Sequence, residues 1–294
     1  MLADRNCLVC GSDSEVWLTR RDRTMRRCQK CGLLWVPEGL ATVDGVSIYE
    51  QDSPVFFEDG RDDYYLDDSN FLNFEEKDGW VRGFAPDGEL LDVGSAFGHF
   101  AAVAQRHRPV TAIELSPVAV QWASATLQVN MRRGSIYDEF PDFVGRFSAV
   151  TLWDVIEHVP DPERALRAAR TWLRPGGWLF MSTPDAGSLV ARALGRRWHY
   201  IDPVQHLVLF DRRNLGTLVE RAGFRVRESR SFGRVYKTAY IANKLSSLGR
   251  STPVWRLAGA TVRSMLWALP SHLRVNAGDV MLIAAQVDSG TLAG

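Results

Sequence analysis

Cysteine is scarce in this 294-residue sequence, and all four copies lie within the first 31 residues. The rest of the chain therefore has no thiol with which to build a disulfide framework. Neither sign of charge is in excess, since 35 Lys and Arg residues balance 35 Asp and Glu residues. A balanced charge gives no overall attraction to nucleic acid or to an anionic membrane. Apolar residues make up 46% of the chain, which is ordinary for a globular protein and too high for a disordered one.

Long apolar runs are also absent. The most apolar late stretch, 254–270, is interrupted by Arg256 and Arg263 and is too short to span a bilayer. The first residues, MLADRN, are polar and no apolar stretch follows them, so we expect no signal peptide. Together with reduced thiols, these absences predict a cytoplasmic protein without a transmembrane span. Charge is nevertheless uneven locally, because residues 19–30 are basic and residues 58–78 are acidic. Charged surfaces exposed to solvent explain such runs as well as binding sites for charged partners do.

The four cysteines form two pairs with the same spacing. Two residues separate Cys7 from Cys10 and Cys28 from Cys31, and 17 residues lie between the pairs. A two-residue gap lets both thiolates of a pair reach one tetrahedral ion, and four thiolates close its coordination sphere. The pattern therefore predicts a structural Zn²⁺ site. Two disulfides, or an iron–sulfur or other redox site, are the alternatives.

A glycine follows each cysteine pair. Gly11 and Gly32 relax the backbone there, so that amide N–H groups can turn toward the sulfurs. Two such turns facing each other make a zinc ribbon, which we place at residues 1–40, with short strands at 16–19 and 33–36.

From residue 88 onward, apolar runs alternate with amphipathic segments, the pattern of a parallel sheet covered by helices. Seven strands are expected, at 89–94, 109–115, 129–134, 147–154, 177–183, 224–232 and 279–287. Helices are expected at 99–107, 116–127, 161–173 and 211–223. Two strands follow the last of these helices, which predicts that the seventh strand runs antiparallel. The fold class is thus α/β, a Rossmann-like seven-stranded sheet with its last strand antiparallel, in a domain spanning 86–290.

Two further segments accompany this core. Residues 41–85 carry many aromatic and acidic side chains, and we expect a helical linker that caps the cofactor region. Residues 234–277 form a long insertion before the last strand, and their apolar periodicity predicts two or three helices. The insertion could shape the acceptor pocket, form a homodimer interface, or make peripheral membrane contact through Arg256, Arg263 and Trp267. All three roles stay open.

A glycine-rich turn, D-V-G-S-A-F-G at 92–98, follows the first strand. Gly94 permits a tight turn, and Gly98 lets the start of the next helix approach a ligand. Exposed amides at that helix start would favour a carboxylate or phosphate. Glu114 ends the second strand, where a carboxylate can accept hydrogen bonds from both ribose hydroxyls. A nicotinamide cofactor predicts G-x-G-x-x-G, whereas this sequence has the shorter G-x-A-x-G.

Four stretches resemble the class I S-adenosylmethionine (SAM)-dependent methyltransferases, and in particular the quinone-biosynthesis and natural-product O-methyltransferases. They are LLDVGSAFGHF, FSAVTLWDVIEHVPDPERAL, LRPGGWLFMSTP and WHYIDPVQHLVLFDRRNLGTLVERAGF. Their order and spacing are as in that family. One departure is Ala96, where the family usually has glycine. The resemblance implies a methyltransferase that binds SAM.

The resemblance also implies where each part of the cofactor would bind. Gly94, Ser95 and Gly98 would surround its methionine end, assisted by Asp92. Trp153 would lie beside the reactive sulfonium.

For the adenosyl end, the resemblance implies that Glu114 holds the ribose and that Leu115 packs on the adenine. Ser135 and Ile136, after the third strand, would border the adenine as well. The acid usual at the position of Ser135 is missing here.

Methyl transfer to an oxygen nucleophile of high pKa needs a base, and histidine suits neutral pH. Three histidines are expected at the carboxyl edge of the sheet. His206 is the preferred base, since its loop, with Trp198 and Tyr200, would cover the substrate. His158 could act instead, or only tie down its loop, and His199 is the third candidate. A purely structural role for His206 is the alternative.

Gln205 stands where relatives often carry glutamate, and a few quinone-group enzymes hold a divalent ion with nearby acids. The amide argues against a metal at this place.

The leading interpretation is a SAM-dependent methyltransferase acting on a small-molecule acceptor, by O-methylation of a sugar, polyketide, quinone-like or lipid-linked substrate. An RNA methyltransferase could instead use the basic stretch 19–30 of the ribbon to grip nucleic acid. The balanced charge and the acidic stretch 58–78 count against that partner. A third reading is a scaffold that binds the cofactor without catalysis, and the intact cofactor turn counts against it.

Overall fold

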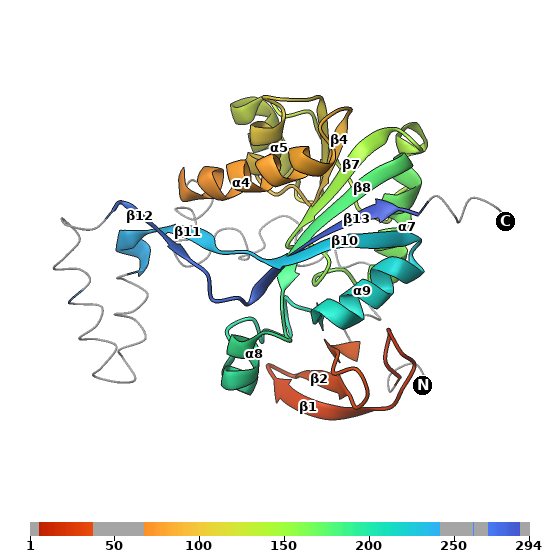
Figure 1. Cartoon of the computed structure of the whole chain (residues 1–294), viewed down its shortest axis with the longest axis vertical. Coiled ribbons are helices and arrows are strands. Elements are labelled where there is room, and N and C mark those ends of the chain that lie inside the picture. The colour runs from red at the N-terminus through yellow and green to blue at the C-terminus, as the bar shows by residue number, and fades with distance from the viewer. Residues whose placement is uncertain (1–5, 38–67, 242–260, 262–269, 289–294) are drawn as a thin grey trace.

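The computed structural model describes residues 6–37, 68–241, 261 and 270–288. Within these residues the chain forms a seven-stranded sheet flanked by helices, and a small four-stranded sheet lies at the lower end of the view in Figure 1. The helices expected at 41–67 and in the middle of the insertion lie outside the described residues, as does any dimer or membrane contact made there. No described helix is long and apolar enough to cross a membrane.

The large sheet has the predicted architecture. Its strands are β4 (Leu90–Val93), β5 (Val110–Glu114), β6 (Met131–Arg133), β7 (Phe147–Trp153), β8 (Leu173–Pro184), β10 (Phe224–Ser231) and β13 (Val280–Val287). Their order is β10-β13-β8-β7-β4-β5-β6. β13 runs antiparallel to both neighbours, whereas β8, β7, β4, β5 and β6 pair in parallel. The α/β class with an antiparallel last strand is thereby confirmed. Every residue of β7 is buried, as expected for a sheet covered on both faces.

The helices are α4 (Asp68–Phe84), α5 (His99–Ala104), α6 (Pro117–Trp122), α7 (Pro162–Trp172), α8 (Leu189–Leu194) and α9 (Arg212–Arg221). Short helical turns follow at η2 (Ala123–Leu127), η3 (Pro141–Phe143) and η4 (Gly195–Arg197). Ser116, Asp161 and Asp211 cap α6, α7 and α9, each accepting a hydrogen bond from a backbone N–H of the first turn. The predicted helix at 116–127 is divided, since α6 passes into the π-helical turn η2.

The N-terminal segment forms a second sheet that includes a strand of the core. Its strands are β1 (Ser14–Arg20), β2 (Arg23–Cys28), β3 (Leu34–Trp35) and β9 (Val208–Leu209), in the order β1-β2-β3-β9. β1 and β3 match the strands expected at 16–19 and 33–36. β2 and the pairing with β9 were not predicted. The residues of β1, β2 and β3 with the flanking cysteine turns are called the ribbon below.

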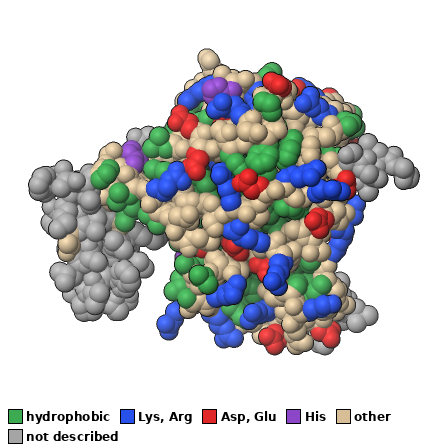
Figure 2. All heavy atoms as spheres, viewed as in Figure 1, with side chains coloured by type: hydrophobic (Ala, Val, Ile, Leu, Met, Phe, Trp, Pro, Cys, Tyr) green, Lys and Arg blue, Asp and Glu red, His purple; other side chains and the backbone are tan. Residues whose placement is uncertain are grey.

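Basic residues of the ribbon are partly engaged by their own chain. Figure 2 shows Lys and Arg side chains over the lower part of the molecule, where the ribbon lies, with acidic side chains among them. Arg20 Nη1 donates to the carbonyl oxygen of Ile201 at 2.7 Å, and Arg21 Nη1 lies 3.8 Å from Asp202 Oδ2. Part of the basic stretch 19–30 therefore attaches the ribbon to the core.

The ends of the 234–277 insertion differ from the prediction. β11 (Arg234–Lys237) and β12 (His272–Val275) form a two-stranded antiparallel sheet, with Arg234 paired to Val275 and Lys237 to His272. The two strands were not predicted, and residues 238–241, which follow β11, are helical. β11 and β12 are strands because they continue β10 and β13, which are already antiparallel neighbours, so the two chain segments leave the sheet side by side.

Candidate active site

The glycine-rich turn lies at the carboxyl end of β4. Gly94 has a φ of +66°, and a Cβ added there would lie 2.7 Å from Val155 Cγ2. Gly98, the residue before α5, has a φ of +74°, and a Cβ there would lie 3.0 Å from Ala123 Cβ. Both positions combine a left-handed backbone with close neighbours, which only glycine accommodates without strain. The turn is thus built to keep this backbone close-packed and unobstructed by side chains.

Asp92 braces the turn from the end of β4. Its buried carboxylate accepts hydrogen bonds from Ser95 Oγ at 2.5 Å and from Thr151 Oγ1 at 2.6 Å. Burial raises the pKa of Asp92 to about 6, although the two hydroxyls oppose that shift. Asp92 therefore connects the turn to β7, the next strand of the sheet.

Glu114 connects the ends of β4 and β5. Its Oε2 accepts the backbone N–H of Ala96 at 2.8 Å, and its Oε1 accepts that of Ser116 at 2.9 Å. Burial raises the pKa of Glu114, and the backbone hydrogen bonds counteract the rise. A carboxylate has roughly four lone-pair sites, so each oxygen can accept one further hydrogen bond. Two adjacent hydroxyls of a ligand match that capacity.

The segment after β6 borders the same region. Ile136 is buried, and Leu115 and Ser135 are half-buried. The backbone N–H of Ser135 donates to Asp138 Oδ2 at 2.8 Å, so an acid does lie beside the position where the sequence lacks one. The sequence comparison missed Asp138 because it stands three residues later.

Lys77 is a buried cation that the sequence interpretation missed. Its side chain comes from α4 and is only 3% exposed; its ammonium donates to Ser182 Oγ at 3.1 Å and lies 4.6 Å from the centre of the Trp153 ring. Burial lowers the pKa of Lys77 to about 8, and Asp154 is the main group opposing that shift. One signal was available: Phe74, Lys77 and Val81 follow helical spacing, which puts the lysine on an apolar stripe.

Trp153 ends β7 next to this lysine. Its ring packs edge-on against Phe100 at 5.1 Å, and its buried Nε1 has no hydrogen-bond partner among the described residues. An unpaired buried donor is uncommon and marks a place where another group is expected.

Asp154 follows Trp153 in a strained conformation. Its φ of +55° lies in the left-handed region, which is costly for a residue with a side chain. Its carboxylate accepts hydrogen bonds from Ser182 Oγ at 3.0 Å and from Arg234 Nη2 at 2.7 Å. Burial alone would raise the pKa of Asp154, but Arg234 and Lys77 lower it to about 2. An ionised carboxylate is thus held in place between two cations.

Two of the three candidate histidines lie together with Glu157. The rings of His158 and His206 are 4.9 Å apart, and a ring nitrogen of each lies within 4.8 Å of a Glu157 carboxylate oxygen. His158 Nδ1 donates to the carbonyl oxygen of Gln205 at 2.6 Å, and His206 Nδ1 donates to that of Tyr200 at 2.7 Å. A carbonyl only accepts, so both protons are on Nδ1 and each ring keeps Nε2 as its acceptor.

Burial sets the charge of this cluster. It lowers the pKa of both His158 and His206, and it raises the pKa of Glu157 to about 7 with the help of Asp154. The two imidazoles are therefore neutral near pH 7. The side chains of Glu157, His158 and His206 could also hold a divalent cation. The adjacent Gln205 adds no carboxylate to this group, and its backbone carbonyl accepts the hydrogen bond from His158.

His199 lies outside this cluster. Its side chain is 62% exposed, and its Nε2 is 3.7 Å from Asp279 Oδ2. Trp198, from the same loop, is buried and donates its Nε1 proton to Asp279 Oδ2 at 3.2 Å. Tyr200 is the loop aromatic that approaches the cluster, with its ring 5.8 Å from that of His206.

A family model described as a methyltransferase domain matches residues 70–229, which is more than half of the chain. This chain belongs to the methyltransferase-domain family. The matched residues contain the glycine-rich turn, Glu114, Trp153 and the histidine cluster.

Relatives and solved structures agree with this family. The chain is 40% identical over 109 residues to a ubiquinone biosynthesis O-methyltransferase from Xanthomonas campestris, covering 35% of this chain and 46% of that protein. It is 37% identical over 101 residues to the protein of that name from Chromobacterium violaceum, covering 32% and 44%. The chain thus spans about half the length of the curated relatives it matches. A SAM-dependent methyltransferase from Thermotoga maritima shares the fold, with a TM-score of 0.51 and 18% identity over 78% of this chain and 94% of that one.

Ala96, where the resemblance described above implies glycine, has a φ of +47°. An alanine in the left-handed region destabilises the folded state by about 1 kcal/mol or more. Ala96→Gly removes that strain, but glycine also raises the entropy of the unfolded chain, which opposes the gain. We therefore expect Ala96→Gly to raise the free energy of unfolding by up to about 1 kcal/mol. Urea unfolding measures the change. Ala102→Gly, in the interior of α5, is the matched control and should destabilise by about 1 kcal/mol. An equal loss of unfolding free energy in Ala96→Gly and Ala102→Gly would contradict backbone strain at Ala96.

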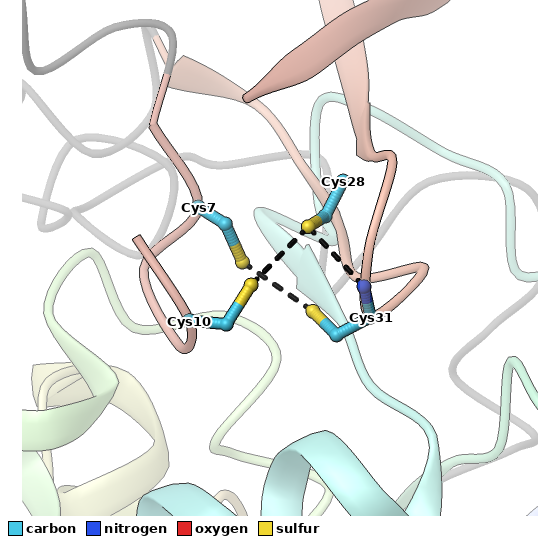
Figure 3. Close-up of side chains that lie close together, drawn as sticks. All are labelled: Cys7, Cys10, Cys28 and Cys31. Atoms are coloured by element: carbon cyan, nitrogen blue, oxygen red, sulfur yellow. Dashed lines mark hydrogen bonds between the residues drawn. The ribbon is translucent and has the colours of Figure 1, made fainter. Parts of the chain in front are cut away.

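The four cysteines of this methyltransferase-family chain converge on one point, as Figure 3 shows. Cys7 Sγ lies 3.5 Å from Cys31 Sγ, and Cys10 Sγ lies 3.4 Å from Cys28 Sγ. All four are free thiols rather than disulfides, and their sulfurs could hold one metal ion. Tetrahedral Zn²⁺ with bonds of about 2.3 Å would place the sulfurs slightly farther apart, at about 3.8 Å.

Backbone amides also turn toward the sulfurs. Val9 N donates to Cys7 Sγ at 3.4 Å, and Cys31 N donates to Cys28 Sγ at 3.3 Å. Gly11 and Gly32 have φ values of +68° and +75° with open space around them, so backbone conformation, and not crowding, favours glycine there. This geometry is the one expected from the spacing of the cysteine pairs.

Proposed function

We propose that this chain transfers a methyl group from SAM to a hydroxyl oxygen of a small, quinone-like aromatic acceptor. One observation carries the proposal: a glycine turn braced by Glu114 lies at the same sheet edge as two neutral histidines with fixed tautomers. The first feature suits a nucleoside ligand, and the second suits removal of a proton from a hydroxyl.

The residues at the turn fit the cofactor. The open oxygen lone pairs of Glu114 suit the two ribose hydroxyls, and Leu115 and Ile136 offer apolar contact to the adenine. Gly94, Ser95 and Gly98 would surround the methionine end. The buried Lys77 ammonium, near Trp153, is a suitable partner for a carboxylate on that end.

When bound, SAM supplies an electrophilic methyl group on a sulfonium sulfur. The chain's own part is to orient the acceptor, to exclude water and to take up a proton. His206 is the proposed base because Tyr200 holds its Nδ1 proton and leaves Nε2 to accept the hydroxyl proton. The Glu157 carboxylate would stabilise the imidazolium that results. His158 is the second candidate, and the exposed His199 is the third.

The acceptor class is inferred from the relatives and the side chains near His206. The matched relatives are named for O-methylation in ubiquinone biosynthesis. The Tyr200 ring lies 5.8 Å from that of His206. Burial raises the pKa of Tyr200, and Tyr236, which stacks on Tyr240 at 5.7 Å, is near enough to add to that rise. Aromatic side chains of this kind suit a flat ring.

For the ribbon we propose structural Zn²⁺ on Cys7, Cys10, Cys28 and Cys31. Four free thiols within reach of one ion support it. Reduced cysteines also fit the expected cytoplasmic location.

Incubation with SAM carrying a labelled methyl group and catechol, a hydroxylated ring, tests the proposed activity. We expect labelled methyl on a catechol oxygen, detected by mass spectrometry. Label that stays on SAM, while the protein still binds S-adenosylhomocysteine (SAH), would reject this acceptor class.

His206→Asn should lower kcat with this probe by about 100- to 10,000-fold, the usual contribution of a general base. The affinity for SAH should stay within about threefold, because His206 takes no part in the hydrogen bonds around Glu114. Stopped assays and calorimetry give the two values. His107→Asn, an exposed histidine beside Asp78, is the matched control and should keep full activity. Full activity in His206→Asn would remove this residue as the base.

A further inference from the structure

The segment that carries His206 lies between the ribbon and the Glu157 loop. On one side, Leu209 pairs with Leu34 and Val208 with Trp35, and Val36 N donates to the carbonyl oxygen of Leu207 at 2.8 Å. These contacts place β9 directly against the ribbon strand β3.

On the other side, the same segment contacts the loop after β7. Leu207 N and Val208 N both donate to the carbonyl oxygen of Glu157, at 2.8 and 3.1 Å. The carbonyl of Gln205 receives the Nδ1 proton of His158. One short stretch, residues 205–208, therefore supports Glu157 and the His158 imidazole and carries His206 itself.

The strand β3 is in turn attached to the cysteine site. Cys28 N donates to the carbonyl oxygen of Leu33 at 2.9 Å, and β3 begins three residues after Cys31. Trp35 and Val36 are fully buried, as are Val208 and Leu209 opposite them. Displacement of the cysteine turn would thus be transmitted to β9 through close packing and a backbone ladder.

Among the described residues, the cofactor turn has no comparable backbone pairing with the ribbon. The hydrogen bonds that shape it join Asp92 to Ser95, and Glu114 to Ala96 and Ser116, and none of them includes a ribbon residue. A change in the ribbon should therefore reach the histidines without reaching the cofactor site.

We propose that the ribbon is a positioning element of the acceptor site: through the β3–β9 pairing, metal loading of the four cysteines holds His206 and His158 in their Nδ1–H tautomers and leaves cofactor affinity unchanged. The proposal rests on the proposed zinc site and the proposed base. It makes the metal state of the ribbon a control on the proton-accepting step.

Nitrogen-15 NMR of the histidine rings tests this in the full chain. Zn²⁺-loaded protein should give the Nδ1–H signature for His206 and His158. Removal of Zn²⁺ with a chelator should replace it by the averaged signals of a free imidazole and speed amide exchange at Leu207 and Val208 at least tenfold. SAH affinity should change less than threefold, and added Zn²⁺ should restore both signals.

Val36→Pro tests the same link with Zn²⁺ still bound, since it deletes the N–H that donates to Leu207. It should disturb both imidazole signatures. Arg221→Gln is the matched control. Arg221 donates from Nη1 to the carbonyl oxygen of Leu8 at 3.3 Å and from Nη2 to that of Val9, so it attaches the ribbon to the core at a place away from β3. Loss of these two hydrogen bonds should leave the imidazole signals unchanged.

Unchanged tautomers and exchange in both the Zn²⁺-free protein and Val36→Pro would overturn the proposal. A parallel loss of SAH affinity would overturn it too, because that result means general unfolding. Failure of the zinc-loaded protein to bind SAH would instead refute the proposed function. The imidazole spectra would still show whether the metal site of the ribbon is coupled to His158 and His206.

Discussion

Glu114→Ala is expected to lower the affinity for SAH by roughly 100-fold or more. The substitution removes the carboxylate that would accept hydrogen bonds from the two ribose hydroxyls. Each hydrogen bond to a charged group contributes about 1.5–3 kcal/mol to the binding free energy. The substitution also leaves the N–H groups of Ala96 and Ser116 without their acceptor, which loosens the turn that contacts the cofactor. Isothermal titration calorimetry with SAH measures the effect directly.

Two further variants separate ribose binding from loop support. Glu114→Gln keeps one oxygen acceptor and should lose less affinity, about tenfold. Glu89→Gln changes the glutamate just before β4, whose carboxylate pairs with Arg146, and this variant should bind SAH like the unchanged protein. An affinity unaltered in Glu114→Ala would remove Glu114 from the ribose site.

Cys28→Ser is expected to have the largest effect on stability. Structural zinc in small ribbons contributes about 10–16 kcal/mol of apparent binding energy at neutral pH, and a serine hydroxyl is a poor replacement for a buried thiolate. Because the ribbon shares a hydrophobic cluster with the main sheet, its loss should destabilise the core as well. We expect substoichiometric zinc by elemental analysis and a Tm at least about 10 °C lower, the shift caused by roughly 3–5 kcal/mol in a chain of this size.

Thr19→Ala is the control within the ribbon. Its hydroxyl is exposed and lies 3.5 Å from that of Thr24, at the end of the β1–β2 hairpin far from the sulfurs. It should keep one zinc per chain and a nearly unchanged Tm. A Cys28→Ser protein with full zinc and an unaltered Tm would contradict a structural metal on these cysteines.

Features encoded by local pattern could be predicted from the sequence. The alternation of apolar runs and amphipathic segments predicted the order of the seven strands along the chain. The helices expected to begin at 116 and 211 begin there in the structure, with Ser116 and Asp211 as their N-caps. The two cysteine pairs likewise predicted their own meeting point, because metal-ligand spacing is a local signal.

Features that depend on distant partners could not be predicted. β9 has only two residues, which is too short to show the alternating pattern of a strand. Its pairing with β3 also joins segments more than 170 positions apart, and no local sequence pattern indicates such a pairing. The burial of Lys77 was hidden because it follows two glutamates at the end of an acidic stretch, which is typical of a solvated surface. The left-handed backbone of Asp154 also depends on tertiary contacts, with Arg234 and Ser182. The convergence of His158 and His206 depends on where two loops meet.

Binding of SAH to the unmodified, zinc-loaded chain is the most direct test that the β4 and β5 ends form an adenosyl site. In a calorimetric titration of protein whose folding is verified by circular dichroism, we expect saturable heat with one SAH per chain, and competition by SAM. Absence of any heat with either compound, on folded protein, would contradict the site.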